Sequence, residues 1–192
     1  VDFYLKSLQA SQIYNEDLSY AVELSEPLQS TLEWDYDPND STRLILRWNI
    51  TLMNGYGGIL AFSNHDSDTN YLDVILFNQD KQLSNGYTDE NSLLFIPDDS
   101  VKLSYSVFSS ISRENRRQTK HTIRIIRPLD TCDEQKRNYI IDQGTTHLLT
   151  GLMSPEDYQI FRRQKTVKVD VERMNLTLQR VQLLKSRVRF TL

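Results

Sequence analysis

Short alternating segments, each closed by turn-forming residues, constrain the fold of this 192-residue chain more than any other feature. Within residues 43–52, every second residue from Leu44 to Ile50 is apolar, which predicts a strand with one buried face. Residues 31–36 alternate in the same way, and turn-forming residues at 35–40 join the two segments into a hairpin. Further strands are predicted at 20–24, 59–63, 71–77, 81–87, 101–108, 121–127 and 145–150, with one or two more within 167–184. Many short strands without a long helix between them predict an all-β fold, an immunoglobulin-like antiparallel β-sandwich.

One short helix is predicted near residues 154–163. Ser154 is placed to cap its N-terminus, Pro155 fits the first turn, and Asp157 follows three residues after the cap. Apolar contacts from this helix are expected from Tyr158, Ile160 and Phe161. The predicted domain organisation is an N-terminal segment at 1–17, one β-sandwich at 18–185, and a tail or linker stub at 186–192.

The predicted strand at 121–127 breaks its own alternation near its end. Polar and apolar residues take turns as far as Ile125, but Ile126 is apolar as well, and Arg127 is polar. This pattern favours a strand whose end is bulged or buried on both faces. Pro128, which has no N–H to donate to a ladder, is expected to end it.

Composition narrows the classes of function. The net charge of −4 and the lack of a basic stripe with interleaved aromatic residues argue against a nucleic-acid binder. No apolar run has the length of a membrane span, and the first residues do not form a signal peptide. The single cysteine allows no internal disulfide. Asn-x-Ser/Thr sequons, which are candidate glycosylation sites, lie at Asn39, Asn49 and Asn175.

Familiar catalytic patterns are missing from the sequence. It contains no nucleophile elbow, no phosphate-binding glycine loop and no Cys/His zinc spacing. Haem ligation by a methionine and a histidine is one alternative, although the sequence cannot show whether two such side chains meet across one interior face. The residues of the right type are Met53, Met153, Met174, His65, His121 and His147.

Four stretches, in order and in spacing, resemble a DOMON domain of the kind that precedes the copper domains of dopamine β-hydroxylase and tyramine β-hydroxylase. The resemblance covers residues 30–185 and is carried by Gly55–Ser63 (GYGGILAFS), Leu72–Ile75 (LDVI), Arg127–Asp133 with Asp142–Leu148 (RPLDTCD, DQGTTHL), and Leu178–Lys185 (LQRVQLLK). Residues 186–192 depart from it, because they lack the proline-rich continuation toward the catalytic half.

The resemblance implies a non-catalytic module of a copper- and ascorbate-dependent monooxygenase in the secretory pathway, in a secretory vesicle or outside the cell. Copper would be bound only by further domains of the same polypeptide, because nothing in this chain matches their His/Met ligands. The module would serve domain and subunit contacts in a homo-oligomer. The alternative is a free-standing secreted module that binds haem or a sugar.

Asp73 is the carboxylate that most needs an explanation. Alternation puts it on the same strand face as Ile75 and Phe77, where an unpaired carboxylate is costly. A carboxylate there either accepts hydrogen bonds from the amides of a neighbouring loop or binds a hard cation. The resemblance implies Ca²⁺ or a similar ion, held by the carboxylates of Asp73 and Asp99 and by the backbone carbonyls of Val74 and Gly86, with Asp98 as a competitor for Asp99.

Cys132 follows a predicted strand end and is therefore expected near the surface. The resemblance implies that it forms a disulfide with a distant cysteine outside the module. The alternative is a small buried side chain, which is how most free cysteines behave.

Overall fold

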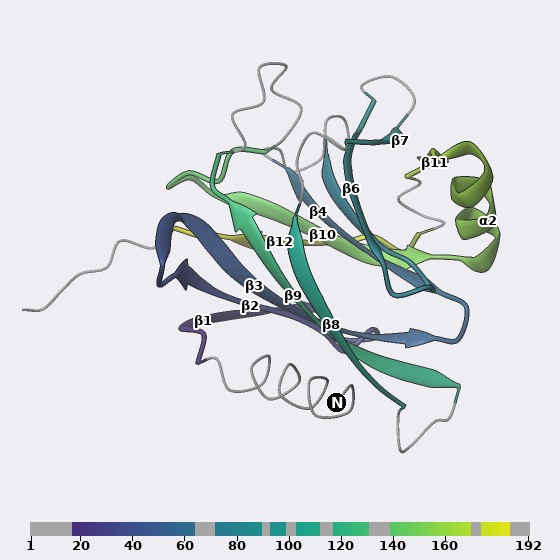
Figure 1. The fold of residues 1–192 in the computed structure, drawn as a ribbon, viewed down its shortest axis with the longest axis horizontal. Helices are drawn as coiled ribbons and strands as arrows, with labels where there is room; N and C mark the ends of the chain where they lie inside the picture. The colour runs from purple at the N-terminus through teal and green to yellow at the C-terminus, as the bar shows by residue number, and fades with distance from the viewer. Residues whose placement is uncertain are drawn as a thin grey trace, which may run out of the picture.

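The computed structural model describes residues 17–63, 72–89, 93–98, 103–111, 117–130, 139–169 and 174–184. These residues form two antiparallel sheets packed face to face, with one short helix beside them (Figure 1). The prediction of an all-β antiparallel sandwich is therefore confirmed. Of the predicted terminal segments, only Asp17 is among the described residues.

The five-stranded sheet, the lower layer in Figure 1, has the order β1-β2-β3-β9-β8. Its centre is β3, which forms the predicted hairpin with β2 and pairs with β9 from Arg43 to Met53. The strands are β1 (Tyr20–Ser25), β2 (Ser30–Asp37), β3 (Asp40–Met53), β8 (Ser104–Ile111) and β9 (Gln118–Pro128).

The seven-stranded sheet has the order β11-β7-β6-β5-β4-β10-β12. The strands β5 and β4 lie at its centre and are buried throughout. The strands are β4 (Gly57–Ser63), β5 (Asp73–Phe77), β6 (Leu83–Thr88), β7 (Leu94–Pro97), β10 (Thr146–Met153), β11 (Val167–Lys168) and β12 (Thr177–Val181).

Alternation along β4 and β5 separates two apolar layers. Leu60 and Ile75 face the five-stranded sheet and join a core that contains Trp48. Ile59 and Val74 face the other way and join a second core, which the helix α2 (Pro155–Gln164) covers. The central strands of the seven-stranded sheet are thus covered on both faces, which explains why every residue of β4 and β5 is buried.

The N-terminus of α2 is capped as predicted. The Oγ atom of Ser154 accepts a hydrogen bond from the backbone N–H of Asp157 at 3.1 Å. Tyr158 and Phe161 are buried against the sheet, but Ile160 is 39% exposed, so the prediction that it makes core contacts is wrong. The reason is helical geometry, because residues two apart in a helix do not share a face.

The end of the 121–127 strand was predicted to be bulged or buried on both faces, and the structure shows no bulge there. The register of β9 with β3 runs without a shift from Gln118 to Pro128. Ile125 and Arg127 both face inward, whereas Ile126 is half-buried on the other face. The alternation therefore never breaks, and a charged residue occupies the last inward position.

Within the described residues, no helix is long and apolar enough to span a membrane.

Candidate functional site

Asp73 and Arg127 meet between the two sheets. Asp73 is the first residue of β5 and pairs in register with Phe62 of β4. Arg127 lies one residue before the end of β9, opposite Leu44 of β3. Their inward positions bring the two side chains together across the sandwich, where Asp73 is 5% and Arg127 is 2% exposed. The fold thus places one negatively charged and one positively charged side chain where both are removed from water.

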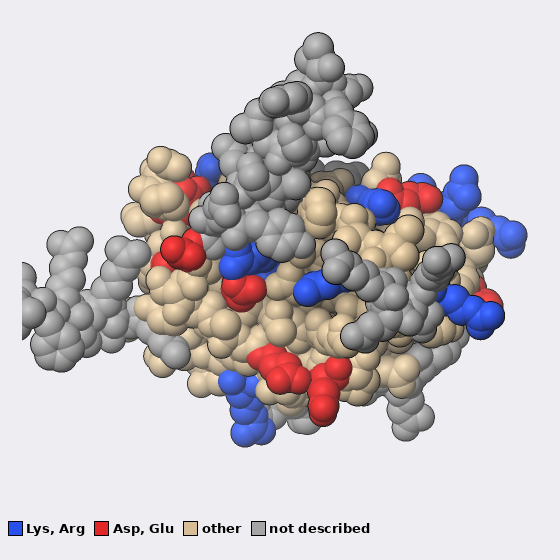
Figure 2. Space-filling view, turned by 90° about the horizontal axis from the view of Figure 1, so that it is seen from below, with Lys and Arg blue, Asp and Glu red and all other residues tan. Residues whose placement is uncertain are grey.

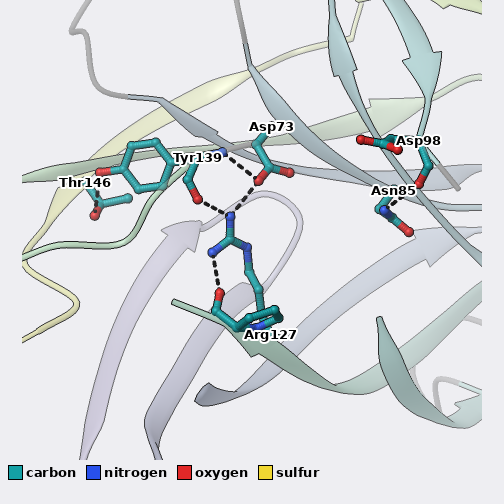
Figure 3. A network of polar contacts seen from close by, with 7 residues as sticks. Asp73, Asn85, Asp98, Arg127, Tyr139 and Thr146 are labelled. Atoms are coloured by element: carbon teal, nitrogen blue, oxygen red, sulfur yellow. Dashed lines mark hydrogen bonds and ion pairs between the residues drawn. The ribbon is translucent and has the colours of Figure 1, made fainter. Parts of the chain in front are cut away.

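The side chains of Asp73 and Arg127 form one hydrogen-bonded network with neighbouring backbone groups (Figure 3). Nη2 of Arg127 lies 2.6 Å from Oδ2 of Asp73 and donates to the carbonyl oxygen of Tyr139 at 2.5 Å. The backbone N–H of Tyr139 donates to the same Oδ2 atom at 3.0 Å, and Nη1 of Arg127 donates to the carbonyl of Pro128 at 3.0 Å. Such bonds are what make a buried ion pair tolerable, because Coulomb attraction alone rarely repays the desolvation of both charges.

Aromatic contacts complete this cluster. The Arg127 guanidinium lies 4.9 Å from the centre of the Phe62 ring, which stacks on Tyr139 at 6.3 Å between ring centroids. The Tyr139 hydroxyl donates to Oγ1 of Thr146 at 3.1 Å, and burial raises the pKa of this tyrosine. We call these five residues, Phe62, Asp73, Arg127, Tyr139 and Thr146, the inter-sheet cluster.

The inter-sheet cluster joins sequence stretches that lie far apart in the chain. Phe62 comes from β4, Asp73 from β5, Arg127 from β9 and Thr146 from β10. These four residues, but not Tyr139, belong to stretches that carry the resemblance described above. The cluster offers no exposed nucleophile. What it can do is fix the two sheets and the segment around Tyr139 in one arrangement.

Of the predicted cation ligands, the structure brings Val74 and Gly86 together as a facing pair of β5 and β6. The N–H of Thr88 donates to the carbonyl of Leu72 at 2.9 Å. Every second residue pair of an antiparallel ladder is a hydrogen-bonded pair, so the pair Val74 and Gly86, two residues further along, is of this kind. Both predicted carbonyl ligands therefore already accept ladder hydrogen bonds.

Asp98, the competitor for the fourth ligand, is buried directly after β7, and its carbonyl oxygen accepts a hydrogen bond from Asn85 (Figure 3). Asp99 lies outside the described residues. The Asp73 charge is balanced by Arg127, so its burial is explained without an ion. No group of three potential metal-ligating side chains is found in the part of the chain that the structure describes. The cation site remains a prediction from the resemblance alone.

Gly86 has a packing role that the sequence does not reveal. A Cβ atom at this position would lie 2.1 Å from the carbonyl oxygen of Ile96 and 2.7 Å from the Phe95 ring. Only a glycine therefore lets β6 and β7 approach this closely.

The three sequons differ in their surroundings. Asn39 is exposed in the turn between β2 and β3, and Asn175 is exposed in a turn with a φ angle of 50°. Asn49 lies on β3, and its side-chain nitrogen donates to Thr31 and Glu33, both at 3.1 Å. In the folded chain, the accessible candidates for glycosylation are therefore Asn39 and Asn175.

Those candidate haem ligands that the structure describes do not converge on one large cavity. Met153 and Met174 are buried beneath α2, and His147 lies on β10. Met53 and His121 line one pocket of about 210 Å³, which is below the range of about 300–1,000 Å³ for pockets that hold drug-sized ligands. His65 and Cys132 lie outside the described residues.

Sequence reasoning missed two members of the inter-sheet cluster. No role was predicted for Arg127, although continuing the alternation of Ile123 and Ile125 would have placed it inside. The role of Tyr139 depends on its backbone groups, which carry no signal in the sequence.

Comparisons with known proteins add little. The chain matches no family model, and no curated protein matches it. One solved structure that resembles it is a candidate carbohydrate-binding protein from Bacteroides uniformis, with 9% identity, a TM-score of 0.39, and coverage of 96% of this chain and 84% of the other.

Proposed function

We propose that this chain is a non-catalytic DOMON module of a copper monooxygenase similar to dopamine β-hydroxylase and tyramine β-hydroxylase. One observation supports this proposal above the others. Three of the four stretches that carry the resemblance supply Phe62, Asp73, Arg127 and Thr146 to the inter-sheet cluster, which is centred on the Asp73–Arg127 ion pair. These three stretches, which are separate in the sequence, are therefore in contact in the folded chain.

In this proposal, the module holds and orients other parts of a larger protein. The catalytic copper domains of the same polypeptide are its partners, and the complete protein is a homo-oligomer of the secretory pathway. Cys132 forms the covalent tether to one of those domains. Ca²⁺ or a similar ion at Asp73, Val74, Gly86 and Asp99 belongs to the proposal as well, and a chelator that lowers the melting temperature would support it.

The isolated chain is expected to show no hydroxylation of tyramine or dopamine when copper and ascorbate are supplied. The physical reason is that nothing in the sequence matches the His/Met ligands of the copper domains, and the described residues contain no group of three His, Cys, Asp or Glu side chains that could hold a metal ion. The measurement is product formation by chromatography, with a complete enzyme of this class as the positive control. Turnover above that of a protein-free control would contradict the proposal that the module is non-catalytic.

A second candidate function is sugar binding, favoured by a groove on the outer face of the five-stranded sheet. The groove has a volume of about 570 Å³, within the range of about 300–1,000 Å³ for ligand pockets. Figure 2 looks onto this side of the molecule, where acidic and basic side chains lie side by side. Polar side chains line the groove, among them Glu33, Arg47, Asn49, Lys120 and Thr122. Saturable binding of a saccharide that is lost in Asn49→Ala would favour this function.

A further inference from the structure

A second, smaller pocket lies at one end of the sandwich. It has a volume of about 210 Å³ and lies between the turns that follow β3 and β5 and the paired strands β8 and β9. Its wall is mixed, with exposed Met53 and Ile111 beside amide and hydroxyl groups. Among the described residues that line it there is one lysine, Lys81, and no aspartate or glutamate. The pocket is therefore electropositive.

His121 forms part of the wall and is 7% exposed. Its Nδ1 atom lies 2.9 Å from the hydroxyl oxygen of Ser109, and its ring packs edge-on against Phe77 at 4.8 Å between centroids. The second ring nitrogen, Nε2, makes no hydrogen bond to any residue in the described ranges. Burial, together with the nearby charge of Lys81, lowers the pKa of His121 to about 4, so the ring is neutral at pH 7. His121 thus brings a neutral imidazole, held by Ser109 and Phe77, to the wall of the pocket.

Lys81 is held at the pocket by a structured turn. Its backbone N–H donates to the carbonyl of Asn78 at 3.0 Å, and the side-chain oxygen of Asn78 accepts from the N–H groups of Asp80 and Gln82. The neighbouring carboxylate of Asp80 is bonded by the hydroxyl of Tyr158. No carboxylate within the described residues forms an ion pair with Lys81, so its charge is available to a ligand.

We propose that this pocket binds a small oxyanion, a carboxylate or a phosphate group, between the Lys81 ammonium and the Nε2–H of His121. The proposal places the ring proton of His121 on Nε2, which is the tautomer in which Nδ1 accepts a hydrogen bond from the hydroxyl of Ser109, 2.9 Å away. The two donors differ in kind, one a charged ammonium and the other a neutral N–H fixed in direction. The small volume suits a single oxyanion group better than a drug-sized molecule.

Nitrogen NMR of the histidine rings tests this site in the intact chain. The sequence has three histidines, and His121→Gln identifies the signals of His121 by their loss. Sodium acetate and sodium phosphate are titrated separately at pH 7 and constant ionic strength. We expect a saturable shift of the Nε2 signal of His121 with at least one anion. A response to acetate assigns a carboxylate site, a response to phosphate assigns a phosphate site, and a response to both supports the general proposal.

Two matched lysine variants separate this site from general attraction of anions. Lys81→Gln is expected to raise the dissociation constant at least about tenfold, because a charged hydrogen bond is lost. Lys168→Gln removes an exposed lysine on β11 and is expected to leave the constant unchanged. Ser109→Ala is expected to move the ring toward a mixture of tautomers, which the nitrogen shifts report directly. The proposal is overturned if neither anion shifts the His121 signals, or if Lys81→Gln binds as tightly as the wild type.

Discussion

Replacing Arg127 by methionine is expected to lower the free energy of unfolding by about 3–5 kcal/mol. Methionine keeps much of the side-chain volume, so the loss comes from the polar groups left behind. The Asp73 carboxylate would remain buried without its counter-charge, and the carbonyl of Tyr139 would lose its donor. Urea denaturation followed by tryptophan fluorescence measures the change.

Two control variants make this result specific. Arg47→Met removes the arginine of a partly exposed pair with Glu33, and a loss below about 1 kcal/mol is expected there. In the double variant Asp73→Leu/Arg127→Met, the loss is expected to fall short of the sum of the single losses by about 0.5–3 kcal/mol. Equal losses in Arg127→Met and Arg47→Met would show that the buried pair has no special role.

Replacing Gly86 by alanine is expected to destabilise the protein by about 1–3 kcal/mol or more. The added Cβ atom would collide with backbone, at 2.1 Å from the carbonyl oxygen of Ile96, and backbone within a sheet cannot move aside as a flexible side chain can. The strands β6 and β7 would have to separate, which breaks their ladder at the Gly86–Pro97 pair. Thermal unfolding followed by circular dichroism detects the change.

Gly144→Ala is the matched control for this substitution. A Cβ atom there would meet the side chain of Asp142, whose position can adjust, so a change within about 0.5 kcal/mol is expected. If Gly86→Ala were no more destabilising than Gly144→Ala, the close approach of β6 and β7 would not explain the glycine.

Local pattern was enough to predict much of this fold. The β2–β3 hairpin and the Ser154 cap follow from alternation and turn chemistry, which act over a few residues. The strand β7 was not predicted, because four residues ending in Pro97 carry little alternation. It is instead held by the preceding strand β6 and by β11, which lies far along the chain.

In the candidate site, too, the local sequence pattern predicted the direction of a side chain but not its partner in the other sheet. The inward phase of Asp73 was predicted from its strand, and the structure confirms it. Its partner was not predicted, because Arg127 lies 54 residues further along the chain and meets Asp73 only through the packing of two sheets. The sequence left two ways to satisfy this carboxylate, amides of a neighbouring loop or a cation, and the structure shows an arginine together with one such amide, the N–H of Tyr139. The spacing of residues cannot distinguish these ways of balancing a buried carboxylate.

The complete coding sequence, read from the transcript that contains this chain, tests the central proposal most directly. The proposal predicts one open reading frame that continues into domains bearing the histidine and methionine ligands of copper, with a second cysteine available to pair with Cys132. The intact mass of the protein purified from its source should agree with that longer frame. A frame that encodes no copper-binding domain, together with a matching intact mass, would contradict the proposal that this chain is a module of a copper monooxygenase.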